Sequence, residues 1–149
     1  MKFLLGLLAL IIGSANIGNA QTFAYLGGQN GPELDVYGFE GARDAPIVIY
    51  VHGGAWMIGD KRQVRDKPAF FNGNGYVFVS VNYTLVPRGT VEGQLAEIDA
   101  AIGFVADNAA RFGGGAGNIS LMGHSAGAHL VTMAAVHPGP QGVIVKSGV

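Results

Sequence analysis

The sequence contains no cysteine among its 149 residues, and only 13% of its residues are charged. The absence of cysteine excludes disulfide bonds, thiolate metal ligands and a lipidated cysteine. The net charge is −1 and no basic patch is present, so nothing in the composition indicates a partner among nucleic acids or anionic membranes. No His, Asp and Glu residues cluster at metal-ligand spacing, and we expect neither a metal ion nor an organic cofactor.

The first twenty residues have the features of a secretory signal peptide. Lys2 precedes an apolar run over residues 3–12, and residues 18–20 place small side chains at the usual cleavage position. The alternative is a membrane-spanning helix, which needs about 20 predominantly apolar residues, and polar residues from position 14 onward interrupt the run too early. We therefore predict a signal peptide over residues 1–20, a mature domain over residues 21–149 without a membrane anchor, and a secreted or periplasmic location.

Glycine is abundant, with 25 residues, and it alternates with short β-branched apolar runs. Such runs, bounded by turn residues, are typical of strands that are covered on both faces of a parallel sheet. We predict strands over residues 22–25, 33–37, 47–51, 76–82, 118–122 and 142–147. Apolar side chains at helical spacing and the positions of glycine predict helices over residues 66–71, 91–112 and 126–136. This alternation predicts an α/β fold, with a mostly parallel sheet and helices on both of its faces.

The sequence Gly123-His124-Ser125-Ala126-Gly127 has the G-x-S-x-G spacing of a nucleophile elbow. Its position between a predicted buried strand and a small-residue helix is the context that the motif requires. A serine hydroxyl is a weak nucleophile that needs a base, and the oxyanion that it generates needs fixed hydrogen-bond donors. We predict Ser125 as the catalytic nucleophile and the N–H of Ala126 as an oxyanion donor. Gly123, His124 and Gly127 are assigned to the backbone geometry of the turn.

A second glycine-rich motif, His52-Gly53-Gly54-Ala55-Trp56, directly follows an earlier predicted strand. Glycine at these positions lets the N–H groups of Gly54 and Ala55 face an oxyanion. An isolated motif of this kind favours a simple turn, but its pairing with the elbow, in this order, favours an oxyanion hole. We predict that Gly53 serves the loop geometry, that His52 braces the loop through hydrogen bonds rather than acting as the base, and that Trp56 packs to fix the loop.

With these motifs the chain resembles the N-terminal part of an α/β-hydrolase-fold serine esterase. The resemblance is to small esterases with an HGG-type oxyanion loop, the acetyl-, feruloyl- and carboxylesterase-like group that grades into arylformamidases. It runs from about Leu34 to the C-terminus, and the stretches that carry it are residues 50–56 with Gly59-Asp60-Lys61, residues 79–83 and residues 119–130. The resemblance implies hydrolysis of a small-molecule carboxylic ester without a cofactor, and it leaves the oligomeric state open.

The triad order of this fold, Ser, then Asp or Glu, then His, is not completed by the sequence. Asp107 is the last acidic residue, and only His129 and His137 follow Ser125. His129 is one helical turn beyond the nucleophile and is predicted to be a packed helix residue, while His137 is predicted to be solvent-exposed in a turn. Neither is assigned as the base, and no acid is assigned.

We therefore expect the chain to be an N-terminal fragment of an esterase, truncated after the strand that follows the nucleophile helix. By itself it is expected to be weak or inactive, and the adjoining coding sequence is expected to encode an Asp and a His. Two alternatives stay open. The chain is either a non-catalytic α/β-hydrolase-like protein that binds small esters or a partner, or it performs amidase, thioesterase or peptidase chemistry on the same half-site. The motifs do not separate these chemistries, because all of them use the same nucleophile and oxyanion hole.

Overall fold

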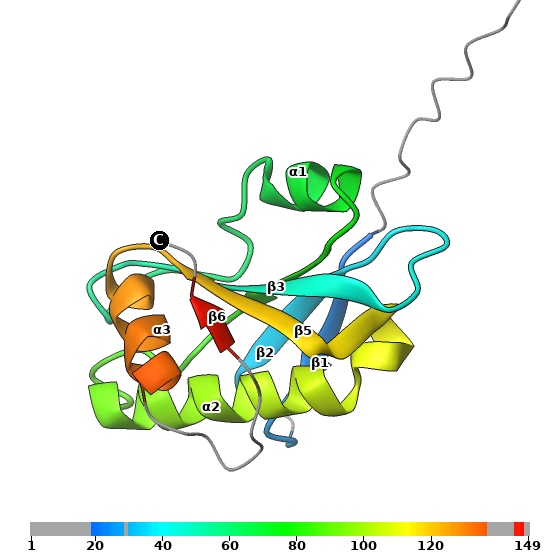
Figure 1. Ribbon diagram of the computed structural model, residues 1–149. Coiled ribbons are helices and arrows are strands. Elements are labelled where there is room, and N and C mark those ends of the chain that lie inside the picture. Colours follow the sequence, from blue (N-terminus) through cyan, green and yellow to red (C-terminus); the bar gives the residue numbers. More distant parts are fainter. Residues whose placement is uncertain (1–18, 29, 137–144, 148–149) are drawn as a thin grey trace, which may run out of the picture.

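The computed structural model describes residues 19–28, 30–136 and 145–147. A six-stranded sheet in the order β1-β2-β4-β3-β5-β6 runs through the described part of the chain (Figure 1). The strands are β1 Gln21–Ala24, β2 Glu33–Tyr37, β3 Ala45–Val51, β4 Val77–Val81, β5 Gly114–Gly123 and β6 Val145–Ser147. The helices are α1 Lys67–Gly73, α2 Val91–Asp107 and α3 Ala126–Val136, with a short 3-10 helix, η1 Ala109–Phe112, after α2. Most of the predicted signal peptide, residues 1–18, and His137 lie outside the described residues.

The sheet is parallel from β4 to β6 and antiparallel at its other edge. β4 pairs with β3, β3 with β5, and β5 with β6 in parallel, whereas β1 and β2 join through antiparallel pairs. α1 covers one face, and α2 and α3 lie side by side on the other (Figure 1). The predicted architecture, a mostly parallel sheet with helices on both faces, is confirmed. No helix of the described residues is long and apolar enough to cross a membrane.

Alternation along β3 divides the core between the two faces. Ile47, Ile49 and Val51 belong to the larger buried cluster, which includes residues of α2 and α3, whereas Val48 and Tyr50 belong to a smaller cluster beside α1. Both faces of the strand are therefore buried, as its continuous apolar sequence predicts. The burial holds the carboxyl end of β3 rigidly beside the carboxyl end of β5.

Among the described residues, two boundaries differ from the sequence prediction by four residues or more. β5 begins at Gly114 rather than at residue 118, because Gly114 pairs with Ala45 and lies against the side chain of Ile47, where an added Cβ would be 2.5 Å from Ile47 Cδ1. The role of Gly114 is therefore to let the two strands pack closely inside the sheet, and it does not form a turn before the strand. The predicted helix over residues 91–112 ends at Asp107 and continues as η1.

Candidate active site

The elbow is a strained turn of two residues between β5 and α3. Ser125 has a φ of +53°, a left-handed conformation that residues with a side chain rarely adopt. An added Cβ on Gly123 would be 2.5 Å from the carbonyl oxygen of Gly127, and one on Gly127 would collide with the carbonyl oxygen of Val51. The two glycines therefore allow α3 to begin directly against the ends of β5 and β3.

Backbone hydrogen bonds hold this turn on both sides. His124 N donates to Val51 O at 3.2 Å, Gly127 N donates to His124 O at 2.9 Å, and His129 N donates to Ser125 O at 3.2 Å. The side chain of Ser125 is exposed, and none of the described residues hydrogen-bonds to its hydroxyl. A non-glycine residue in such a conformation costs about 1–3 kcal/mol, a strain that proteins retain mostly at functional positions.

The loop after β3 contains three consecutive residues at positive φ: Gly54 at +123°, Ala55 at +50° and Trp56 at +62°. The carbonyl of Gly54 closes the loop by accepting hydrogen bonds from Met57 N and Ile58 N, both at 3.0 Å. Ala55 and Trp56 carry side chains, which disfavour positive φ. Their conformation is therefore imposed by the surrounding structure rather than by local preference.

The elbow and this loop are in contact. β3 and β5 are parallel neighbours with Val51 opposite Gly123, so the segments that follow them leave the sheet side by side. An added Cβ on Gly53 would be 2.7 Å from His124 O and 3.1 Å from Ser125 Cβ. The structure thus brings together the two motifs that the sequence separates by about seventy positions.

Three backbone N–H groups at this junction have no acceptor in the part of the chain that the structure describes: those of Gly54, Ala55 and Ala126. Ala126 is the first residue of α3, where N–H groups lack intrahelical partners and the helix dipole adds partial positive charge. Donors without an internal partner are available to a ligand oxygen.

His52 is fully enclosed and braces the loop. Its Nδ1 lies 2.7 Å from Gly53 O, and since a carbonyl only accepts, Nδ1 carries the proton. The imidazole stacks on Tyr83 at 4.5 Å between ring centroids, and the Tyr83 hydroxyl donates to His52 O at 2.9 Å. Burial raises the pKa of Tyr83 to about 12. Burial also lowers the pKa of His52, against the opposing effects of the Gly53 hydrogen bond and the Asp60 charge.

This shift predicts that the protein loses stability as the pH falls below about 6.5, the usual pKa of histidine. Below that pH the unfolded chain protonates His52 more readily than the folded chain does, so the free energy of unfolding decreases until the folded-state pKa is reached. Urea unfolding at pH 7.5, 6.5 and 5.5 measures the effect. His52→Gln is expected to lose this part of the pH dependence, and the exposed His129→Gln is the control. Equal pH dependence in both variants would assign the effect to other groups.

Gln94 on α2 is a site residue that the sequence analysis did not single out. It is fully buried, and its Nε2 donates to Trp56 O at 2.9 Å and to Thr84 O at 3.0 Å, so α2 ties the loop after β3 to the segment after β4. Trp56 also packs edge-on against His129, which is exposed, with ring centroids 5.5 Å apart. A sequence signal existed: Gln94 is a polar residue in the apolar stripe of α2, between Val91 and Ile98.

Replacing Gln94 with leucine is expected to lower the free energy of unfolding by about 2 kcal/mol, since it leaves Thr84 O without its donor and removes one of the two donors to Trp56 O, which keeps the hydrogen bond from Val86 N. Urea denaturation measures the change. Gln63→Leu, at an exposed position, is the control and is expected to change stability by less than about 0.5 kcal/mol. A Gln94 variant as stable as the Gln63 variant would contradict the anchoring role.

A cavity of about 820 Å³ opens beside the junction of the two motifs. Its lining includes Gly53 and Gly54 of the loop and His124 of the elbow, together with the cationic side chains of Arg65 and Lys67. No described residue adds a carboxylate to this lining. Gly123 and His124, the two residues that precede Ser125, belong to the lining, so the cavity lies beside the nucleophile elbow.

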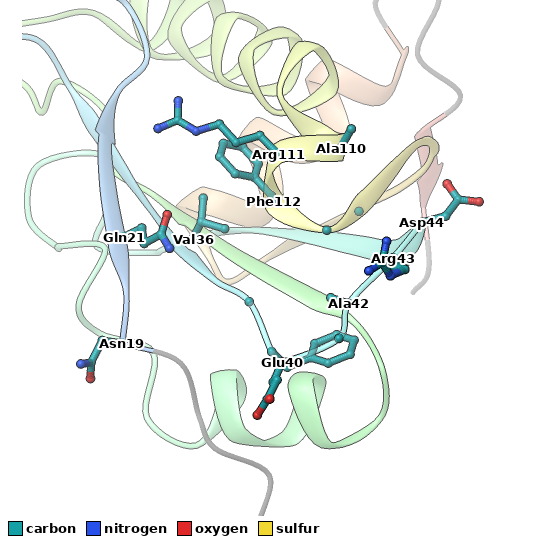
Figure 2. A pocket seen from close by; sticks show the side chains of 15 residues that line it. Asn19, Gln21, Val36, Glu40, Ala42, Arg43, Asp44, Ala110, Arg111 and Phe112 are labelled. Carbon is teal, nitrogen blue, oxygen red and sulfur yellow. The ribbon is translucent and has the colours of Figure 1, made fainter.

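A larger cavity, of about 1020 Å³, lies at the opposite end of the parallel strands (Figure 2). Asp44, just before β3, and Gly113, just before β5, belong to its lining, as do Glu40 and Arg111 (Figure 2). In open α/β sheets, ligands bind beyond the carboxyl ends of the strands. Neither motif contributes to this cavity, so its size does not make it the candidate active site.

A family model described as BD-FAE matches residues 34–143. The chain belongs to the BD-FAE family. It is 40% identical over 95 residues to the esterase LipQ of Mycobacterium tuberculosis, a match that covers 63% of this chain and 23% of that protein. It is also 33% identical over 119 residues to the kynurenine formamidase of Salmo salar, covering 78% of this chain and 39% of that protein.

Among solved structures, this BD-FAE chain is similar to the native form of the thermophilic esterase Est2 of Thermogutta terrifontis. The TM-score is 0.74 at 26% identity, and the match covers 82% of this chain and 46% of that one. The predicted α/β-hydrolase fold and the resemblance to its esterases are confirmed. The chain spans about a quarter of the length of LipQ and about half of Est2, and ester hydrolysis is the activity that both names carry.

Proposed function

We propose that this BD-FAE protein hydrolyses small carboxylic esters with Ser125 as the nucleophile. The observation that supports the proposal most strongly is the junction of the two strained segments. Ser125 sits at positive φ at the end of β5, and Gly53 of the neighbouring loop packs against its Cβ. Strain at two contacting turns, each built on glycines that exclude any side chain, is typical of a pre-organised reaction site.

In the proposed reaction, Ser125 Oγ attacks the ester carbonyl carbon and loses its proton to a base. The new Oγ–C bond displaces the π electrons onto the carbonyl oxygen, and the N–H groups of Gly54, Ala55 and Ala126 donate hydrogen bonds to this oxyanion. Collapse of the intermediate breaks the ester C–O bond, and the leaving alcohol takes up a proton. Water then hydrolyses the acyl-enzyme. No described histidine or carboxylate hydrogen-bonds to Ser125, so the base is assigned to no described residue.

The rate expected of this chain follows from the same geometry. Enzymes that lose a member of the triad retain about 10³–10⁴-fold acceleration over water, through the oxyanion hole and substrate binding. We expect this chain to react with activated acyl or phosphoryl compounds slowly but selectively at Ser125. Because residues 1–20 are predicted to be a signal peptide, we propose that the reaction takes place in the periplasm or outside the cell.

Amide hydrolysis is the second candidate. The match with kynurenine formamidase extends over 119 residues, against 95 for the match with LipQ. The nucleophile and the oxyanion donors proposed here serve an amide carbonyl equally well, so the choice depends on the leaving group. Parallel assays with aryl esters and aryl formamides distinguish the two candidates.

The test is covalent labelling with paraoxon, which phosphorylates esterase 2 of Thermogutta terrifontis. We expect a single diethylphosphoryl group on the peptide that contains Ser125, identified by mass spectrometry after proteolysis. Oγ attack on phosphorus forms the new P–O bond and expels p-nitrophenolate, whose absorbance follows the same reaction. Absence of the adduct, or its random distribution over other serines, would contradict the proposed nucleophile.

A further inference from the structure

A buried ion pair lies beyond the end of the oxyanion loop. Lys61 Nζ is 2.5 Å from Asp35 Oδ1 on β2, and Thr22 Oγ1 on β1 donates to the same oxygen at 2.6 Å. Lys61 is 8% exposed and Asp35 is 3% exposed. Lysine and aspartate are almost never buried to this extent unless they are paired. Glu33, half exposed, is a second and more distant carboxylate, at 3.6 Å.

The main chain of Lys61 is held as firmly as its side chain. Its N–H donates to Asn82 Oδ1 at 2.5 Å, and its carbonyl accepts from Ser80 Oγ at 2.7 Å. Ser80 belongs to β4 and Asn82 directly follows that strand. Lys61 is therefore tied at three points to two neighbouring strands of the sheet.

Gly59 transmits this anchoring to the oxyanion loop. It has a φ of +125°, and an added Cβ would collide with His52 Nδ1 and lie 2.5 Å from Gly53 O. With Lys61 fixed two residues later, Gly59 cannot shift without displacing the imidazole of His52 and the peptide that follows it. The backbone N–H groups of Gly54 and Ala55 follow this peptide directly in the chain, so they would be displaced with it.

We propose that Lys61, through its pair with Asp35, is a positioning residue for the oxyanion loop. Stability alone is a poor explanation for this pair, because two buried charges lose their hydration and apolar replacements are often as stable or more stable. The pair has a geometric effect instead: it holds the segment from Gly59 to Lys61, at the end of the loop, in a single position. The consequence for catalysis rests on the proposed function, whereas the consequence for loop geometry does not.

Trp56 supplies a direct measurement, because it is the only tryptophan in the sequence and lies inside the loop. In Lys61→Met we expect a weaker near-UV circular dichroism band for Trp56 and about twofold greater quenching of its emission by acrylamide, with unchanged far-UV circular dichroism. Asp35→Asn is expected to produce the same change, and Lys61→Arg to restore most of the signal. The matched control is Lys67→Met, a half-buried lysine over the Tyr50 ring, outside the loop, which is expected to leave Trp56 unchanged.

Lys61→Met leaves the buried carboxylate of Asp35 without its partner, which could by itself prevent folding. A second variant controls for this effect. Asp35→Leu combined with Lys61→Met removes both charges and is expected to fold, with the signal of Trp56 still altered. A folded double variant whose Trp56 signal matches that of the wild-type protein would overturn the proposal.

Paraoxon labelling completes the experiment. We expect the rate of Ser125 labelling to fall at least about tenfold in Lys61→Met, because small displacements of reacting groups cost one to two orders of magnitude. If the wild-type chain is not labelled but Trp56 responds, the proposed function fails and the positioning role stands. If labelling proceeds at the same rate in the variant and Trp56 is unchanged, the positioning role fails and the proposed function stands.

Discussion

Replacing Gly127 with alanine is expected to destabilise the protein by at least about 3 kcal/mol, or to prevent its folding. The new Cβ would collide with Val51 O and lie 2.5 Å from His52 O, both of which are backbone atoms at the end of β3. These atoms cannot move freely, because Val51 O accepts the hydrogen bond from His124 N. Overpacking in a core costs about 1–3 kcal/mol when side chains can adjust, and here no side chain is available to adjust.

Gly103→Ala is the matched control for this prediction. Gly103 also lies within a helix, α2, but its added Cβ has no neighbour within 4 Å and its φ is negative. Alanine is expected to stabilise the protein there by about 0.5–1 kcal/mol through its higher helix propensity. Urea unfolding of both variants measures the difference. Two variants of equal stability would mean that α3 does not start against the end of β3.

Replacing Ser125 with alanine is expected to abolish labelling by paraoxon and, with it, the equimolar release of p-nitrophenolate. The exposed hydroxyl has no hydrogen bond to a described residue, so its removal leaves the packing of the elbow unchanged. Alanine at a φ of +53° retains the strain that serine has, and the melting temperature is expected to stay within a few degrees of that of the wild-type protein.

The control is Ser120→Ala, on β5 and half-buried, which is expected to retain labelling. Mass spectrometry of the intact protein gives the extent of labelling, and peptide mapping gives its position. An adduct that persists in Ser125→Ala, at an undiminished rate, would place the nucleophile elsewhere in the chain.

Local sequence patterns were sufficient for the elements whose boundaries depend on local preferences. The predicted strand over residues 33–37 and the predicted helix over residues 126–136 coincide with β2 and α3. The predicted start of β5 is four residues too late, because its first residue, Gly114, is placed by Ala45 and Ile47 on a different strand. A glycine before an apolar run is ambiguous in sequence, since it allows both a turn and a close approach.

The sequence by itself determined the two motifs, their order and the strands that they follow, because glycine spacing and apolar runs are local signals. Only the tertiary structure decided how these motifs are held. Gln94 reaches Trp56 over 38 positions, and Lys61 reaches Asp35 over 26. Neither pairing follows from a periodic pattern, because both depend on the sheet order β1-β2-β4-β3-β5, which brings distant strands together. A polar residue at a buried position indicates that a partner exists, and only the packed fold identifies that partner.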